Sequence, residues 1–418
     1  MTKTTQDAVA SVTVYRFRFR DFLLGAQMLF VAFGALVLVP ILSGLDPNVA
    51  LFTSGLGTLC FQLVTGGKVP VYLASSFAFI APVTLSIEKY GLAATLSGLA
   101  AAGIVYLILS IIVFWGGSGI INRFLPTIVT APVIMVIGLG LASTAVEMAT
   151  NAGDNYSEAT AIGVAAVSLL VTILTAITIR GFLRLIPILT GILAGYLVSL
   201  PLGLVDFSPI AQAPWLDVPS FTAPQFSLPA ILFMLPIAIA PAIEHVGDVL
   251  AISSVTGNDY LRDPGIHRTL LGDGIATTLA AFLGGPPNTT YSEVTGAVAL
   301  TRAFNPAIMT WTAISAILLS FFGKLGAILQ TIPVPVMGGI LIVLFGTVVI
   351  VGLNSLARSP VDLLQPRNIA IVGVILMLGV GGMSVKAGSF ALEGIGLSSI
   401  VGVLLNLLLP EGEKFGDK

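Results

Sequence analysis

Three acidic residues of this 418-residue chain lie in stretches that are otherwise hydrophobic. Glu244 and Asp248 lie within residues 240–250, and Glu293 follows the Pro- and Thr-rich stretch 286–292. A charge placed inside a membrane span costs about 2.5–3.5 kcal/mol on insertion scales, so each acid is a functional candidate. The alternative is that Glu244 and Asp248 cap the cytoplasmic end of a helix and are solvated there.

The spacing of Glu244 and Asp248 indicates proton chemistry. Residues four apart share one face of a helix. When two carboxylates lie this near each other in a poorly hydrated site, they resist being ionised together and titrate as a coupled pair. Such a pair suits a carrier that takes up and releases a proton near neutral pH. His245 points about 100° away around the same helix, where a packing role and a proton role both remain open.

Glu293 indicates ligand binding, because a carboxylate only accepts hydrogen bonds and suits a ligand with adjacent N–H donors. Backbone N–H groups near Tyr291 and Ser292 suit the carbonyl oxygens of the ligand. Together these groups describe a planar amide or imide ring. Phe77 and Tyr291 either contact the flat face of that ring or pack against other side chains.

Two interrupted segments must position these groups. Residues 69–79 and 286–293 each have Pro at or next to their start and continue with small, β-branched or aromatic residues. Pro breaks a helix, and Thr289 and Thr290 favour extended backbone. Non-helical backbone at membrane depth persists only when it is paired inside the protein or lines a cavity. We expect two short antiparallel strands, each leading into a half-helix whose N–H groups face the site; ordinary surface loops are the alternative.

The composition predicts a membrane protein. Only 9% of the residues are charged, against about 25% in globular proteins, and 56% are hydrophobic, which nearly excludes a soluble enzyme. The first hydrophobic run, 22–42, is long enough to span and carries no cleavage pattern of a signal peptide. Thirteen further stretches follow near 50–65, 71–87, 92–116, 125–146, 159–179, 185–203, 228–252, 270–284, 291–304, 307–323, 333–353, 368–385 and 388–409. The predicted fold is an all-α integral membrane protein of fourteen transmembrane segments, with the two strands in broken helices 3 and 10.

The distribution of basic residues predicts the orientation. If the N-terminus, with Lys3, Arg16, Arg18 and Arg20, is cytoplasmic, fourteen crossings place 15 of the 18 basic residues on that side. Only Lys89, Lys324 and Lys386 fall outside. This asymmetry follows the positive-inside rule and predicts that both termini are cytoplasmic.

The two halves of the chain echo each other. The number of residues between Gln27 and Glu244 is nearly the same as the number between Phe77 and Glu293. Because seven segments per half is an odd number, the second half enters the membrane from the opposite side. This is the inverted repeat of secondary transporters.

Four motifs carry a family resemblance: residues 74–79, 244–248, 262–265 and 287–293. With them, the chain resembles the nucleobase–cation symporter-2 (nucleobase–ascorbate transporter) family from about residue 22 to about 409, and most of all its bacterial uracil-transporting members. The resemblance implies proton symport of a nucleobase, a homodimer, and the bacterial inner membrane. It also implies a division of the chain: cytoplasmic segment 1–21, core domain 22–124 and 228–323, gate domain 125–203 and 333–409, and cytoplasmic tail 410–418.

The resemblance also assigns residues. Glu244 and Glu293 match carboxylates that bind the base, and Phe77, Tyr291 and Ser292 match pocket positions. Residues 293–302 match the family signature, and Glu at its start favours uracil over purine. Three departures are Val294 in place of Asn, Met28 in place of His, and Asp248 in place of His. The last occurs in many purine members, so a xanthine or purine permease remains the alternative.

Asp248, Glu244 and His245 are the candidates for proton coupling. We expect no cofactor and no metal, because the chain has two His, one Cys and no zinc or nucleotide motif. Because the net charge is −2, we do not expect nucleic acid as a partner. We expect membrane lipid around the chain. An anion transporter on a similar scaffold is a second hypothesis, but acids at the site argue against it. A channel or a membrane enzyme is a third.

Overall fold

The computed structural model describes residues 14–117, 123, 125–152, 156–387 and 390–410. Most of the predicted cytoplasmic segment 1–21 and nearly all of the tail 410–418 lie outside these residues. Lys3, Lys414 and Lys418 lie outside them as well.

The first half of the chain is helical apart from one short strand. Its elements are η1 (Phe19–Asp21), α2 (Phe22–Ser43), α3 (Pro47–Val64), β1 (Leu73–Ser75), η2 (Phe77–Phe79), α4 (Ile80–Tyr90), α5 (Leu92–Gly116), α7 (Thr127–Gly140), α8 (Ala142–Thr150), α9 (Glu158–Thr178), η3 (Phe182–Leu185) and α10 (Pro187–Ser199).

The second half is also mostly helical, with three short strands. Its elements are α11 (Ser208–Gln212), α12 (Leu228–Met234), α13 (Ile239–Thr256), η4 (Leu261–Gly265), α14 (Ile266–Phe282), β2 (Asn288–Thr290), α15 (Ser292–Thr301), α16 (Ala307–Ser320), α17 (Gly323–Gln330), α18 (Val334–Arg358), α19 (Pro366–Val380), β3 (Ser384–Ala387), β4 (Phe390–Glu393) and α20 (Gly394–Leu408).

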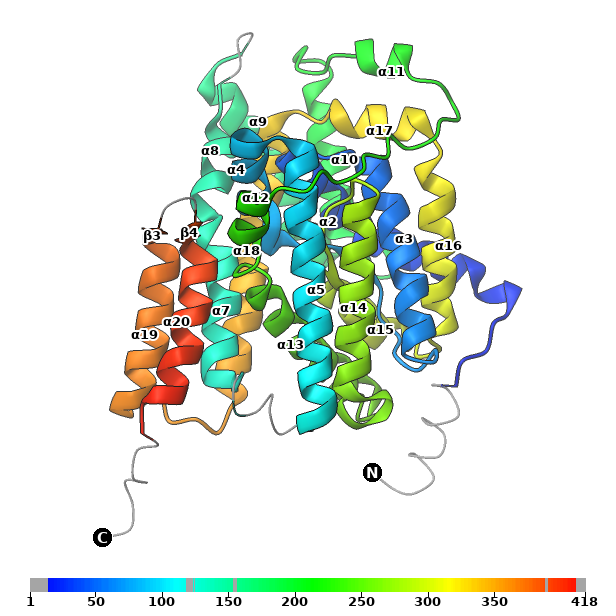
Figure 1. The fold of residues 1–418 in the computed structure, drawn as a ribbon. Helices are drawn as coiled ribbons and strands as arrows, with labels where there is room; N and C mark the ends of the chain where they lie inside the picture. The colour runs from blue at the N-terminus through cyan, green and yellow to red at the C-terminus, as the bar shows by residue number, and fades with distance from the viewer. Residues whose placement is uncertain (1–13, 118–122, 124, 153–155, 388–389, 411–418) are drawn as a thin grey trace.

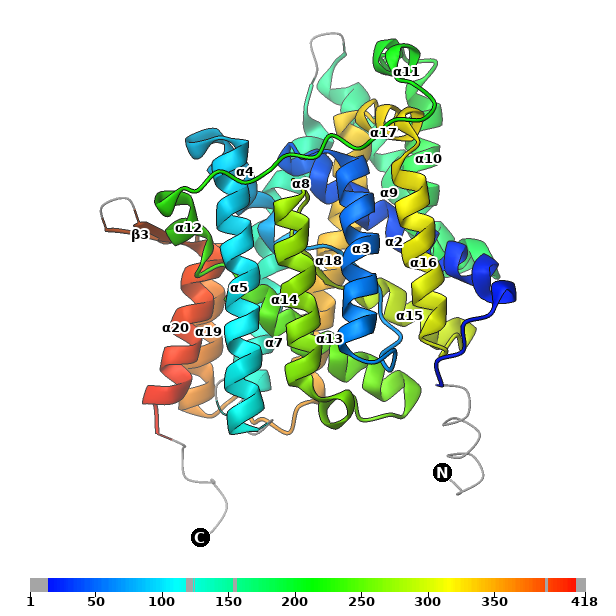
Figure 2. The same cartoon turned by 45° about the vertical axis from the view of Figure 1, so that its right-hand side comes forward.

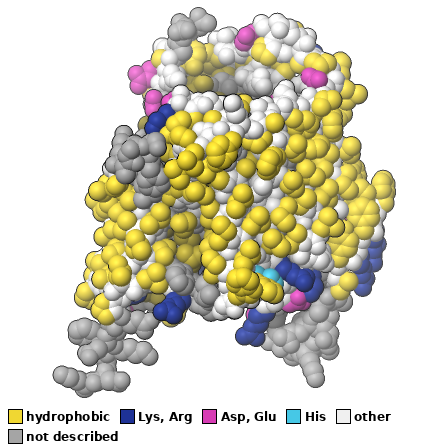
Figure 3. Space-filling model, in the orientation of Figure 1, with side chains coloured by type: hydrophobic (Ala, Val, Ile, Leu, Met, Phe, Trp, Pro, Cys, Tyr) yellow, Lys and Arg dark blue, Asp and Glu magenta, His cyan; other side chains and the backbone are white. Residues whose placement is uncertain are grey.

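Six helices are long and apolar enough to cross a membrane, and two bent pairs raise that number to eight within the described residues. The pairs are α12 with α13, bent by 42°, and α16 with α17, bent by 84°. The predicted span 228–252 is therefore not a single straight helix. The span predicted at 307–323 corresponds to α16, and the chain bends where that span ends. Figure 3 shows hydrophobic side chains over most of the visible surface, with the visible Lys and Arg mostly at its lower end. The fold is that of a mostly helical, multi-pass membrane protein.

The helices pack in two groups. In the first, α5 packs on α14, α3 packs on both α14 and α16, and α2 packs on α16. In the second, α18 packs on α7, α8 and α9, and α19 packs on α20 and α7. The two views in Figures 1 and 2 show α5, α14, α3 and α16 side by side, with α19, α20 and α7 beyond them.

Glycine permits the closest helix approach in the first group. A side chain at Gly103 of α5 would place its Cβ 2.2 Å from Oγ1 of Thr278 on α14. On the facing helix, a Cβ at Gly274 would lie 2.9 Å from the carbonyl oxygen of Gly103. Only glycine fits where two helix backbones meet this closely, as is common in membrane bundles.

The predicted strand pair is confirmed. β1 and β2 are antiparallel, with Leu73 opposite Thr290 and Ser75 opposite Asn288. Two backbone bonds extend the pairing, from Ser76 N to Pro287 O (2.9 Å) and from Tyr291 N to Tyr72 O (3.2 Å). β1 leads through η2 into α4, and β2 leads directly into α15. Two half-helices therefore begin at a shared, buried strand pair.

Helices α19 and α20 occupy most of the stretches predicted at 368–385 and 388–409, but a second strand pair replaces helix where the two stretches meet. β3 and β4 form an antiparallel hairpin between the shorter helices α19 and α20. Gly382, with a φ of +65°, takes the left-handed conformation that ends a helix readily, and the polar residues Ser384 and Lys386 follow it. The hydrophobic stretch alone did not reveal this break.

Candidate functional site

Helix α13 carries three of the predicted site residues: Glu244, His245 and Asp248. The Asp248 side chain is buried, and that of Glu244 is half-buried. The Oε2 atom of Glu244 is buried without a hydrogen-bond partner among the described residues. Since a buried carboxylate oxygen without a donor is costly, this atom is suited to a ligand or to a proton.

The second broken segment binds Asp248. Thr290, the last residue of β2, donates its hydroxyl to Oδ2 of Asp248 over 2.8 Å. Ser292, the first residue of α15, donates its hydroxyl to Oδ1 over 3.1 Å. The turn from strand to helix at Tyr291 brings both hydroxyls to the same carboxylate. Asp248 therefore fixes α15 against α13.

A cavity of about 310 Å³ lies between α13 and α15 on one side and α7 and α18 on the other. Glu244, Asp248, Ser292 and Glu293 all line it, and Thr347, Asn354 and Ser355 of α18 face them. No Lys or Arg occurs among the lining residues described around it. This volume is at the small end of ligand pockets, and its carboxylates suit hydrogen-bond donors.

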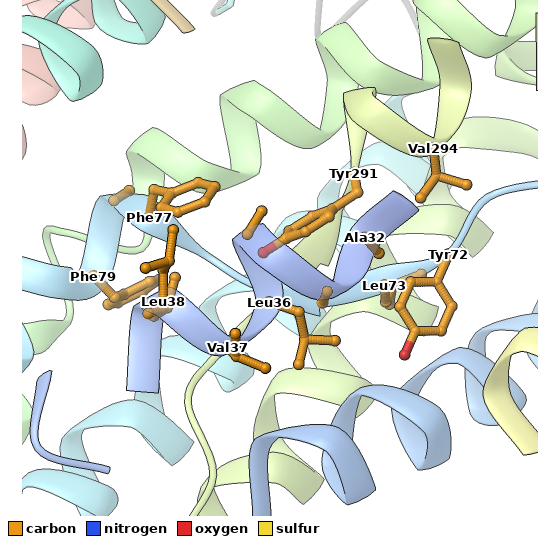
Figure 4. Packing of buried hydrophobic residues seen from close by; sticks show 14 of the residues in the cluster. Ala32, Leu36, Val37, Leu38, Tyr72, Leu73, Phe77, Phe79, Tyr291 and Val294 are labelled. Atoms are coloured by element: carbon orange, nitrogen blue, oxygen red, sulfur yellow. The ribbon is translucent and has the colours of Figure 1, made fainter. Parts of the chain in front are cut away.

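Phe77 and Tyr291 contact each other and do not line this cavity. Their rings are stacked, with centroids 6.1 Å apart and planes inclined by 16°. The Tyr291 hydroxyl donates to the carbonyl oxygen of Ser75 over 2.7 Å, and Phe345 of α18 meets Phe77 edge-on. Figure 4 shows both rings beside α2, near Ala32 and Leu38. In this structure, packing accounts for both aromatic side chains.

His245 points into the protein, away from the cavity. Its ring is fully buried, and Nδ1 lies 3.2 Å from Oδ2 of Asp273, which is also fully buried. Asp273 belongs to α14 and was not among the acids predicted from the sequence, although it lies inside the hydrophobic stretch 270–284. Thr290 was also missed as a side-chain partner. The charge within a predicted span was the signal available for Asp273.

The structure thus places the predicted residues at three locations. Glu244, Asp248, Ser292 and Glu293 meet at one cavity, and His245 lies behind it. Phe77 and Tyr291 lie at the strand pair. Within the part of the chain that the structure describes, no three His, Cys, Asp or Glu side chains gather closely enough to hold a metal ion.

Comparison with known sequences covers nearly the whole chain. A model of the permease family matches residues 19–388. The chain is 54% identical over 389 residues to a probable uracil permease of Pasteurella multocida, covering 93% of each chain. It is 44% identical to the uracil permease of Bacillus subtilis, over 93% of this chain and 92% of that one. It is 40% identical to the uracil permease of Escherichia coli, over 92% and 90%.

Comparison with solved structures shows the fold. The transmembrane domain of the cyanobacterial bicarbonate transporter BicA matches with a TM-score of 0.62 at 14% identity, covering 94% of this chain and 99% of that one. SLC26A9 matches with a TM-score of 0.66 at 12% identity, covering 98% of this chain and 69% of that one. At these identities the likeness concerns the backbone alone.

Proposed function

Because the chain belongs to the permease family known as nucleobase–cation symporter-2, we propose that it is a uracil permease that imports uracil together with protons. It is a transporter and not an enzyme. The observation that carries the proposal is the cavity at which Glu244, Glu293 and Ser292 meet. Relatives between 40% and 54% identical are uracil permeases, which supports the choice of substrate.

The chemistry of uracil fits this cavity. Its ring is flat and carries two N–H donors and two carbonyl oxygens. The carboxylates of Glu244 and Glu293 accept from N–H groups. The first backbone N–H groups of a helix such as α15 have no partner within the helix, so they suit a carbonyl oxygen. In this proposal Phe77 and Tyr291 form the wall of the site when the core and gate helices move.

Proton coupling follows from the crowding of acids. Glu244, Asp248 and Glu293 line one cavity without a basic residue among its described lining residues. Three negative charges around one small, poorly hydrated cavity repel one another strongly. Uptake of a proton relieves the repulsion and leaves Glu293 charged for the substrate. Asp248 and Glu244 are the proposed carriers, and no other cofactor is invoked.

The two helix groups support alternating access. Residues 22–124 and 228–323 would form the core, and residues 125–203 and 333–409 the gate, with the cavity at their boundary. We further propose fourteen spans in a 7+7 inverted repeat, cytoplasmic termini, a homodimer, and residence in the bacterial inner membrane. The antiparallel pairing of β1 with β2, one strand from each half, supports the repeat.

Uptake of radiolabelled uracil into proteoliposomes tests the proposal. With an inward proton gradient, uracil should accumulate above its external concentration, and an uncoupler should abolish the accumulation. Absence of uracil uptake together with uptake of xanthine would instead favour a purine permease. Asp248 in place of the His of uracil-transporting members is the observation behind that second candidate.

The fold shared with a bicarbonate transporter raises the anion alternative. The acids that line the cavity oppose it, because an anion there would need a compensating cation. Bicarbonate or sulfate flux that uracil does not inhibit would overturn the nucleobase proposal.

A further inference from the structure

A buried acid and a buried histidine lie behind the substrate cavity, where the proposed uptake of uracil gives neither a role. His245 of α13 and Asp273 of α14 have no exposed side-chain surface. Nδ1 of His245 is 3.2 Å from Oδ2 of Asp273, and no other donor among the described residues serves this carboxylate. An ionised carboxylate persists in such a place only beside a positive charge or a donated proton.

One hydroxyl connects this pair with the cavity. Oγ1 of Thr290 lies 3.5 Å from Nδ1 of His245 and donates to Oδ2 of Asp248 over 2.8 Å. A hydroxyl both donates and accepts, so it can pass a proton between two partners. Asp248 faces the cavity, and His245 does not. Thr290 therefore stands between a carboxyl at the substrate site and an imidazole in the interior.

The other ionisable groups around the pair are acids and a phenol. Glu244 and Asp248 share α13 with His245, and Glu293 lies across the cavity. Tyr106 of α5 packs against α14 beside Asp273, and its hydroxyl is buried without a partner among the described residues. The described Lys and Arg ion pairs lie elsewhere, at Asp21, Asp259 and Asp263. His245 is thus the group that can become positive here.

We propose that His245 and Asp273 form a second proton-binding site, connected to Asp248 through the Thr290 hydroxyl. The inference rests on the proposed proton-coupled function and adds a place where the proton resides while Asp248 is ionised. The transfer starts from neutral His245 with its proton on Nε2, so that Nδ1 can accept. Protonated Asp248 gives its proton to Oγ1 of Thr290, and the Thr290 hydroxyl proton passes to Nδ1 of His245. The products are the Asp248 carboxylate and a His245 imidazolium that is paired with the Asp273 carboxylate.

Nuclear magnetic resonance of the histidine nitrogens tests the site without any transport. The chain has only two histidines, so His267→Gln leaves the His245 signals alone in the full-length protein in lipid bilayers. If the pair binds a proton, the His245 nitrogen signals should change as the sample is taken stepwise from about pH 8 to about pH 5. Asp273→Asn should weaken that change, since it removes the carboxylate beside Nδ1. A His245 that keeps one neutral form over this range in both proteins would overturn the proposal.

Transport assays test the connection to Asp248. Thr290→Val cannot relay a proton, whereas Thr290→Ser keeps the hydroxyl and is the matched control. Thr290→Val and Asp273→Asn should each lower proton-driven uracil accumulation by about tenfold. That is the effect of a tenfold loss in the fraction of protein that holds the coupled proton. Exchange of uracil at equal pH should fall less. Equal losses in both assays, or accumulation unchanged from the parent, would overturn the inference.

The two assays separate this inference from the proposed function. If the parent protein accumulates no uracil, the proposed function fails, while the histidine spectra still report whether the pair binds a proton. If the parent accumulates uracil and the spectra show no proton uptake by His245, only the second site fails. Retained melting temperature and a monodisperse size-exclusion profile would show that Asp273→Asn is folded.

Discussion

The hydroxyl of Tyr291 donates a hydrogen bond to the carbonyl oxygen of Ser75 over 2.7 Å, across 216 residues of sequence. This contact joins the second broken segment to the first, beside the strand pair in which Leu73 lies opposite Thr290. A side chain from one half of the chain thus supports the backbone of the other half.

Tyr291→Phe tests that contact. The substitution removes the donor and leaves the ring stacked on Phe77, so we expect a loss of about 0.5–1.5 kcal/mol in stability. The melting temperature in detergent should fall modestly, while the protein remains folded. Tyr15→Phe is the control, because it removes an exposed hydrogen bond to the Thr310 hydroxyl (3.1 Å), where water can replace the lost partner. An unchanged melting temperature for Tyr291→Phe would show that the bond contributes nothing.

Glu293→Gln tests substrate binding. Because hydrogen bonds to charged groups are worth about 1.5–3 kcal/mol, we expect uracil affinity to fall by roughly 10- to 150-fold. Calorimetry, or stabilisation against heat by uracil, would measure the loss. Glu147→Gln, on the exposed surface of α8, should bind as the parent does. Equal affinity in Glu293→Gln would remove this residue from the site.

Asp248→Asn tests proton coupling. The amide keeps an oxygen that accepts from Thr290 or Ser292, but it takes up no proton near neutral pH. We expect the parent to take up uracil faster as the external pH falls, and the variant to lose this dependence and to stop concentrating uracil. Asp259→Asn, on an exposed residue paired with Arg262, is the control. A variant that still concentrates uracil would assign coupling to another group.

Gly103→Ala tests the close contact of α5 with α14. The added Cβ would lie 2.2 Å from Oγ1 of Thr278, so the helices must separate at a cost of about 1–3 kcal/mol. Gly163→Ala, in α9, meets nothing within 4 Å and should be neutral or stabilising. The difference between the two melting temperatures measures the crowding, and equal values would show that the helices adapt freely.

The acids at the cavity could be predicted because a charge in an apolar stretch is conspicuous in any sequence. The strand pair could be predicted because Pro, Thr and Tyr interrupt two such stretches at corresponding places. The aromatic residues could not be assigned, since sequence does not say that Phe77 and Tyr291 stack on each other. The partnership of His245 with Asp273 depends on how α13 packs on α14, which no local pattern encodes. The β3–β4 hairpin was missed because its strands lie at the ends of two hydrophobic stretches that were interpreted as helix throughout.

The pairing of β1 with β2 has a consequence for how this protein can change over time. The two half-helices are held at their starting points by main-chain bonds, which every residue except proline can make. Replacing a side chain at Ser292 or Glu293 therefore alters what the cavity binds, while the backbone pairing of β1 with β2 stays in place. Mutations can therefore change which substrate the cavity binds without changing the fold.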